Sequence, residues 1–120
     1  MLGVDIVEHS RMAQFQKNNN FLKKFLFSKE LEQLEGITDK IAYISSRFAA
    51  KEAITKALKG KLLNYIYSDH LLILRSPNSS PHIAISNEFK QKMHETFGKN
   101  NIELSISHEK SLSIAIAILN

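Results

Sequence analysis

Residues 47–58 read RFAAKEAITKAL and contain the most regular helical pattern of the chain. Small and apolar side chains recur there three and four positions apart, which is the spacing of one face of an α-helix. These side chains are Ala50, Ala53, Ile54, Ala57 and Leu58. Because a stripe of small residues lets a helix approach its neighbours closely, we predict a long helix that begins near Asp39, ends at Gly60 and packs against another layer of the fold.

Segments on both sides of this helix alternate apolar and polar residues, as strands do. We predict strands over residues 2–7, 71–74, 82–85, 102–108 and 112–118. Shorter helices are expected over residues 10–15, 20–27, 29–35 and 87–97, with Ser10, Ser28 and Asn87 as N-caps. A polar turn between the last two strands predicts an antiparallel hairpin. The order strand, helices, strands, helix, hairpin predicts an α+β fold with an antiparallel sheet.

The composition is that of a folded protein with one domain, residues 1–120, because 43% of the residues are hydrophobic and 23% are charged. The chain has no cysteine, which excludes disulfides, thiolate nucleophiles and cysteine-ligated metal sites. No apolar run approaches the roughly 20 residues of a membrane-spanning helix. The opening residues MLGVD also lack the basic region of a signal peptide. We therefore expect a soluble, cytoplasmic protein.

The positive charge of the chain is unevenly distributed. The formal net charge is +4, and no acidic residue lies between Glu8 and Glu30. The basic residues in this interval are Arg11, Lys17, Lys23, Lys24 and Lys29. Such an excess favours an anionic partner: nucleic acid, anionic lipid, a phosphorylated ligand or an acidic protein. It is equally typical of a solvated surface, and composition alone does not choose.

Three features could carry chemistry, and each also has an ordinary explanation. Asp5 interrupts an apolar strand, where a carboxylate is costly unless it is exposed, paired or bound to a metal. Glu52 and Lys56 share one helix face, the spacing of a common surface ion pair. His108 ends a strand beside a turn, where a histidine can reach a phosphate or a proton, or can simply end the strand. The chain has no phosphate-binding glycine loop, so a phosphate would be held by side chains and a metal.

The three features stand in motifs that occur in a fixed order. Residues 3–8 (GVDIVE) precede an Arg-Met pair at 11–12, residues 47–58 follow, and residues 105–108 read SISH. Together they resemble the motifs of holo-acyl-carrier-protein synthases, the small bacterial 4′-phosphopantetheinyl transferases. Residues 27–30 (FSKE) lie where this family usually has a Leu-Thr-x-x-Glu segment. The resemblance extends over the whole chain.

The sequence departs from the family pattern at two loops. Residues 59–62 read KGKL where the family usually has a Gly-Thr-Gly turn that shapes the coenzyme A pocket. Residues 79–81 read SSP in place of a Gly-x-Pro segment. Neither loop contains Asp5 or Glu52, the two carboxylates for which the resemblance implies a role in metal binding.

The resemblance implies the family's α+β fold and its reaction in fatty acid biosynthesis. The enzyme would transfer the phosphopantetheine arm of coenzyme A to a serine of acyl carrier protein and release 3′,5′-ADP. Asp5 and Glu52 would hold one Mg²⁺, and Lys56 would neutralise the pyrophosphate. Arg47 and Lys51 would contact coenzyme A phosphates, and His108 would contact a phosphate or maintain the shape of the site. A metal-bound water, Glu8 and His108 remain alternatives for the general base.

The resemblance also implies the protein's partners. The family docks an acidic carrier protein on its first helix, which here carries Arg11, Met12 and Phe15, with Lys23 and Lys24 nearby. It is usually a homotrimer with active sites between protomers. The C-terminal hairpin is apolar on both faces, which a buried subunit contact or a helix packed over the sheet would explain. We expect no nucleic-acid partner and no membrane span. Two alternatives stay open: a non-enzymatic basic module that binds nucleic acid, and a different magnesium-dependent phosphotransferase with the same carboxylates.

Overall fold

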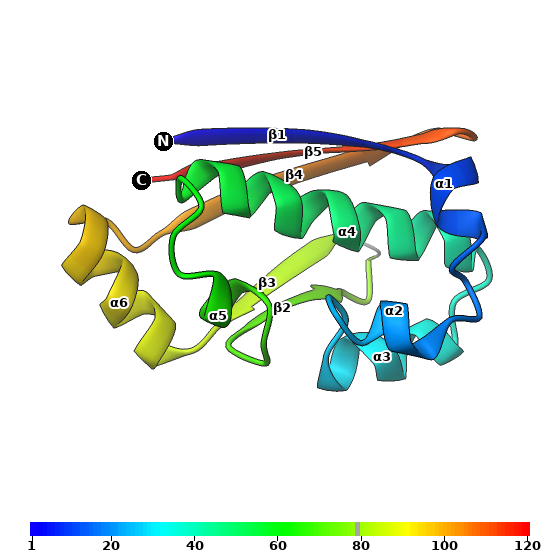
Figure 1. Cartoon of the computed structure of the whole chain (residues 1–120), viewed down its shortest axis with the longest axis horizontal. Helices are drawn as coiled ribbons and strands as arrows, with labels where there is room; N and C mark the ends of the chain where they lie inside the picture. The colour runs from blue at the N-terminus through cyan, green and yellow to red at the C-terminus, as the bar shows by residue number, and fades with distance from the viewer. Residues whose placement is uncertain (79) are drawn as a thin grey trace.

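The long helix α4 (Lys40–Ala57) lies between two antiparallel sheets in a computed structural model that describes residues 1–78 and 80–120 (Figure 1). On one side is a three-stranded sheet of order β1-β5-β4, with strands Leu2–Glu8, Leu112–Leu119 and Ile102–His108. On the other side lies the hairpin of β2 (Leu71–Arg75) and β3 (Pro81–Ile85). The predicted α+β fold is confirmed, with two separate sheets in place of one. Position 79 of the predicted turn lies outside the described residues.

The position of α4 explains its sequence. The helix begins with the side chain of Asp39 accepting a hydrogen bond from the Ala42 N–H (3.1 Å), as its predicted start near Asp39 requires. A helix with layers on two sides needs apolar or small residues around most of its circumference. Accordingly, most residues between Ala42 and Ala57 are buried.

The first strand approaches α4 unusually closely. A Cβ atom at Gly3 would lie 1.9 Å from the backbone oxygen of Ala53, so only glycine fits where β1 crosses the helix. Gly3, Asp5 and Val7 are on the face of β1 toward α4, because Gly3 and Val7 are buried and strand residues alternate in direction. This alternation places Asp5 beside the helix.

Shorter helices cover the two ends of this arrangement (Figure 1). Near the N-terminus of α4 lie α1 (His9–Ala13), α2 (Asn19–Leu22) and α3 (Ser28–Glu35). At the opposite end lie α6 (Asn87–Phe97) and α5 (Leu63–Ile66), a single turn that the sequence analysis did not predict.

The three predicted N-caps are wrong by one or two residues. The cap positions are Glu8 for α1, Phe27 for α3 and Ser86 for α6. Ser86 accepts a hydrogen bond from the Phe89 N–H (3.1 Å). In α3, Glu30 accepts from the Phe27 N–H (3.0 Å) and so satisfies a free amide at the helix start in place of a serine.

The outer face of the three-stranded sheet is apolar along β1 and β5 and is uncovered in the single chain. Along β5 the small residues face α4, and the larger side chains point away from it. The exposed apolar residues of this face are Leu2, Val4, Ile6, Leu112, Ile116 and Ile118. They are neighbours across the strands, because Leu2 pairs with Ile118 and Val4 pairs with Ile116. We call these six residues the outer apolar face.

Candidate active site

The carboxylate of Asp5 forms an ion pair with Lys56 of α4. The Lys56 Nζ lies 3.2 Å from Asp5 Oδ1 and donates a second hydrogen bond to the Val4 carbonyl (3.0 Å). The Asp5 side chain is 17% exposed and that of Lys56 is 55% exposed, so the pair lies at the surface end of the β1–α4 contact. Within the described part of the chain, Lys56 therefore pairs with Asp5 and not with Glu52.

Glu52 lies one helical turn before Lys56 and is bound by Tyr67. The Tyr67 hydroxyl donates a hydrogen bond of 2.9 Å to Glu52 Oε1. Burial raises the pKa of Tyr67 to about 12, and the negative charges of Glu52 and Asp5 add to the increase. The hydrogen bond of Glu52 to Tyr67 thus lies one helical turn along α4 from the ion pair of Lys56 with Asp5.

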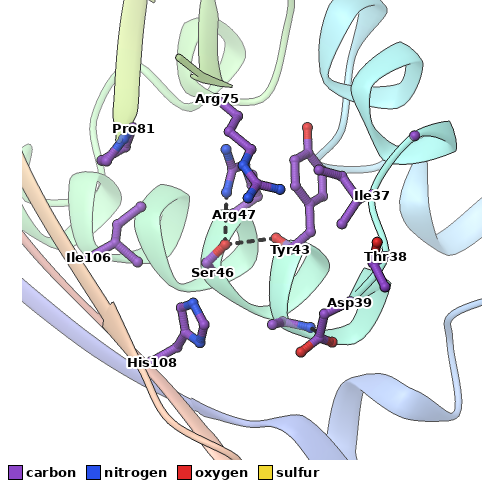
Figure 2. Close-up of a pocket in the computed structure, with 12 residues that line it drawn as sticks. Ile37, Thr38, Asp39, Tyr43, Ser46, Arg47, Arg75, Pro81, Ile106 and His108 are labelled. Atoms are coloured by element: carbon purple, nitrogen blue, oxygen red, sulfur yellow. Dashed lines mark hydrogen bonds between the residues drawn. The ribbon is translucent and has the colours of Figure 1, made fainter. Parts of the chain in front are cut away.

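A second feature is a cavity of about 440 Å³ beside the N-terminal half of α4. Figure 2 shows Arg47 and Arg75 at one side of this cavity and His108 and Ile106 at the other. Arg47 is buried, and three contacts orient its guanidinium. Its Nε donates to the Ile73 carbonyl (3.1 Å), its Nη1 donates to Ser46 Oγ (3.0 Å), and its Cζ lies 4.0 Å from the centre of the Tyr43 ring.

The electrostatics of this cavity favour an anion. Burial lowers the pKa of Arg47, but an arginine guanidinium keeps its charge at neutral pH. Arg75 adds a second guanidinium and His108 adds an imidazole, whereas Asp39 contributes a carboxylate, whose Oδ1 accepts a hydrogen bond from the Ala42 N–H. Two guanidiniums that line one cavity form a suitable site for the phosphates of a ligand.

These two features belong to a chain with clear relatives. The family model for the 4′-phosphopantetheinyl transferase superfamily matches residues 1–117. The chain belongs to the 4′-phosphopantetheinyl transferase superfamily. The holo-acyl-carrier-protein synthase of Pelagibacter ubique is 34% identical over 120 residues, covering 98% of this chain and 94% of the relative. That of Clostridium perfringens strain 13 is 35% identical over 122 residues, covering 98% and 91%.

A solved structure of a superfamily member is similar in fold along the whole chain. The crystal structure of the Helicobacter pylori holo-acyl-carrier-protein synthase in complex with coenzyme A has a TM-score of 0.80 and 32% sequence identity. The match covers 100% of both chains.

In the present chain, Lys51 does not line the arginine cavity. Its side chain is fully buried, and its Nζ lies 2.8 Å from Glu30 Oε1 and 3.4 Å from the Leu71 carbonyl. Burial lowers the pKa of Lys51, and the charge of Glu30 opposes that effect. The expectation that Lys51 contacts a coenzyme A phosphate is therefore wrong in this structure, because its ammonium is paired and shielded.

The basic surface near α1 and α2 is only partly as predicted. Arg11, Lys23 and Lys24 are exposed, as docking of an acidic partner would require. Met12 is fully buried in the core, so its predicted place at the centre of an interface is wrong. Phe15 is half-buried and stacks on Phe21, with ring centres 4.0 Å apart.

The sequence analysis missed Tyr67 and Arg75. Tyr67 follows the unpredicted turn α5, and no spacing relates it to Glu52 in the sequence. Arg75 ends β2, and only the packing of that strand beside α4 brings it to Arg47.

The described residues contain no group of three or more His, Asp or Glu side chains that could hold a metal ion. Among them, no helix is long and apolar enough to cross a membrane.

Proposed function

We propose that this chain acts in the cytoplasm as a holo-acyl-carrier-protein synthase. It would transfer 4′-phosphopantetheine from coenzyme A to a serine of an apo-acyl carrier protein and release 3′,5′-ADP. The observation that carries the proposal is the ion pair of Asp5 with Lys56, one helical turn from Glu52, in a member of the phosphopantetheinyl transferase superfamily. Coenzyme A in the Helicobacter pylori structure supports it as the donor.

The donor set of this site fits Mg²⁺. Asp5 already binds a cationic group, the Lys56 ammonium, and Glu52 Oε1 is held by Tyr67. Magnesium takes few carboxylates and completes its shell with water and substrate phosphates, so two carboxylates from different elements are sufficient. Asp5 and Glu52 would hold the ion, which would neutralise charge on the diphosphate of coenzyme A.

Lys56 and the arginine cavity contribute further positive charge. The Lys56 ammonium is more than half exposed, so it can reach a phosphate oxygen of a bound substrate. Arg47 and His108 line the cavity and would bind another phosphate of coenzyme A, with Arg75 beside them (Figure 2). Positioning and charge neutralisation account for most of the catalysis in phosphoryl transfer, and this set of residues supplies both.

The outer apolar face supports the proposal of a homotrimer with active sites between protomers. Monomeric soluble proteins rarely expose a large contiguous apolar patch, and such patches mark interfaces. Here six neighbouring side chains of β1 and β5 are each between 38% and 62% exposed. A second copy of the chain on this face would bury them.

The acidic carrier protein would dock on the basic surface of α1 and α2. Arg11, Lys23 and Lys24 are exposed there, and Phe15 adds an apolar contact. Electrostatic complementarity of this kind mainly accelerates association and weakens with added salt.

The test is mass spectrometry of an apo-acyl carrier protein incubated with this chain, coenzyme A and Mg²⁺. We expect a mass increase of one phosphopantetheine group, lost with EDTA and strongly reduced in Asp5→Ala and Glu52→Ala. A product formed equally well by both variants would contradict the assignment of the site. If no carrier protein is modified, the proposed function is wrong, and nucleic-acid binding across salt concentrations becomes the next test.

A further inference from the structure

Tyr67 is the direct partner of the proposed metal ligand Glu52. It follows α5 (Leu63–Ile66), in the segment that begins after the KGKL loop at residues 59–62. The hydroxyl oxygen of Tyr67 lies 2.9 Å from Glu52 Oε1. An ionised carboxylate only accepts hydrogen bonds, so the phenol is the donor.

Thr55 contributes to this geometry. Its Oγ1 lies 2.8 Å from the Lys51 carbonyl and 3.4 Å from the Tyr67 hydroxyl. Thr55 is the donor in both contacts, the shorter to the Lys51 carbonyl and the longer to the Tyr67 hydroxyl oxygen. The phenol oxygen accepts from Thr55 and its own proton goes to Glu52, so Tyr67 contacts two positions on one face of α4.

The hydrogen bond fixes which oxygen of the Glu52 carboxylate is occupied, because the phenol reaches Oε1. In the described part of the chain, Tyr67 is the only hydrogen-bond partner of the Glu52 side chain, and Oε2 is left without one.

We propose that Tyr67 is a positioning residue that holds Glu52 Oε1 and thereby directs Oε2 to the metal ion. This inference rests on the proposed function, because it requires Glu52 to be a metal ligand. Carboxylate ligands of metals are themselves commonly hydrogen-bonded, and loss of such a partner typically reduces metal affinity or activity about 10–100-fold.

The chain offers a closely matched control. The Tyr65 hydroxyl donates a 2.8 Å hydrogen bond to Glu88 Oε2, so this pair repeats the phenol–carboxylate contact. Tyr65 stacks on Phe89, with ring centres 5.4 Å apart, and no predicted site residue is part of that pair. Tyr65→Phe and Tyr67→Phe each remove one oxygen and keep the ring.

The test measures binding of Mn²⁺, a paramagnetic substitute for Mg²⁺, by electron paramagnetic resonance in the presence of saturating coenzyme A. The proteins compared are the wild type, Tyr67→Phe, Tyr65→Phe and Glu52→Gln, with thermal unfolding as the check of folding. We expect Tyr67→Phe to weaken Mn²⁺ binding about 10-fold or more. Its unfolding temperature should stay close to that of Tyr65→Phe, which should bind Mn²⁺ like the wild type.

Kinetics supply a second readout. In Tyr67→Phe the Mg²⁺ concentration for half-maximal rate should rise, while the rate at saturating Mg²⁺ and the KM for carrier protein should change less. A merely structural role would impair all three together: the rate would fall, and both the half-maximal Mg²⁺ concentration and the KM for carrier protein would rise. Unchanged Mn²⁺ affinity in Tyr67→Phe, or an equal loss in Tyr65→Phe, would overturn the inference while the proposed function stands. Equal Mn²⁺ binding by wild type and Glu52→Gln would instead overturn the metal site, and the inference with it.

Discussion

Lys51 and Glu30 form a fully buried ion pair, with Lys51 Nζ 2.8 Å from Glu30 Oε1, and this pair joins α4 to α3 and β2. The same carboxylate accepts hydrogen bonds from the Phe27 N–H (3.0 Å) and the Ile73 N–H (2.8 Å). The Ile73 carbonyl in turn accepts from Arg47 Nε. Glu30 is therefore connected to Arg47 of the cavity through one residue of β2, Ile73.

Removal of Glu30 should strongly destabilise the fold. Glu30→Ala leaves the Lys51 ammonium buried without a partner, and loss of one partner from a buried pair typically costs about 3–5 kcal/mol. Urea unfolding measures the change. The control is Glu95→Ala, which breaks the exposed Lys92–Glu95 pair (3.8 Å) and should cost well under about 1 kcal/mol. Similar losses in the free energy of unfolding of the two variants would show that the buried pair stabilises the fold no more than the exposed pair does.

The helical period explains why Lys51 does not share the surroundings of Glu52. Neighbouring positions on a helix are about 100° apart, so Lys51 and Glu52 face different layers. Glu52 accepts a hydrogen bond from Tyr67, whereas Lys51 points toward Glu30, a residue distant in sequence. Spacing identifies which residues share a face but not which layer covers that face.

The core residues show the same limit. The alternation of apolar and polar residues in the strands was confirmed. The sequence does not reveal which face of β1 and β5 packs against α4; only the structure shows that. Gly3 and Ala115 then face the helix, and Ile116 faces outward. Likewise, the family resemblance implied that Met12 contacts the carrier protein, but the short helix α1 turns it into the core.

Gly3 is expected to be sensitive to the smallest substitution. In Gly3→Ala the new Cβ would meet the Ala53 carbonyl oxygen at 1.9 Å, and this atom belongs to helix backbone. Overpacking of this kind typically costs about 1–3 kcal/mol, and it should also move Asp5 away from α4. The matched control is Gly36→Ala, whose Cβ meets only the Gln33 carbonyl oxygen at 3.9 Å. Urea unfolding of both variants tests the prediction, which fails if they are equally stable.

Alkaline pH should weaken the fold through two tyrosines. The pKa values of Tyr43 and Tyr67 are each raised from 10.0 to about 12, mainly by burial. A group whose folded pKa lies above its unfolded value stabilises the protein fully below the unfolded pKa. That contribution is lost as the pH rises from about 10 to about 12. The free energy of unfolding should therefore fall across this range. The fall should be shallower in the double variant Tyr43→Phe/Tyr67→Phe, and identical slopes would contradict the assignment.

The outer apolar face should control assembly. Ile6 belongs to this face and is 57% exposed, so Ile6→Lys would place a charge in the proposed subunit contact. We expect sedimentation to show a trimer for the wild type and smaller species for Ile6→Lys. The control is Leu63→Lys on α5, which is 47% exposed and lies outside the face. If the wild type sediments as a monomer, the proposed trimer is wrong.

Substitutions of Arg47 and Arg11 should raise the KM values for different substrates. Arg47 lines the cavity, so Arg47→Ala should raise the KM for coenzyme A and leave the KM for carrier protein nearly unchanged. Hydrogen bonds to charged groups contribute about 1.5–3 kcal/mol, which corresponds to roughly a 10–100-fold rise in KM. Steady-state kinetics with each substrate varied in turn measures both constants.

Arg11→Ala provides the opposite case. Arg11 is exposed and lies 5.6 Å from the centre of the Phe48 ring, on the surface proposed for the acidic carrier protein. This variant should raise the KM for carrier protein, with a smaller effect at high salt because screening already weakens the attraction. The KM for coenzyme A should stay near the wild-type value. If each variant raised both constants equally, the cavity and the basic surface would not be separate binding sites, and the assignment of one substrate to each would be wrong.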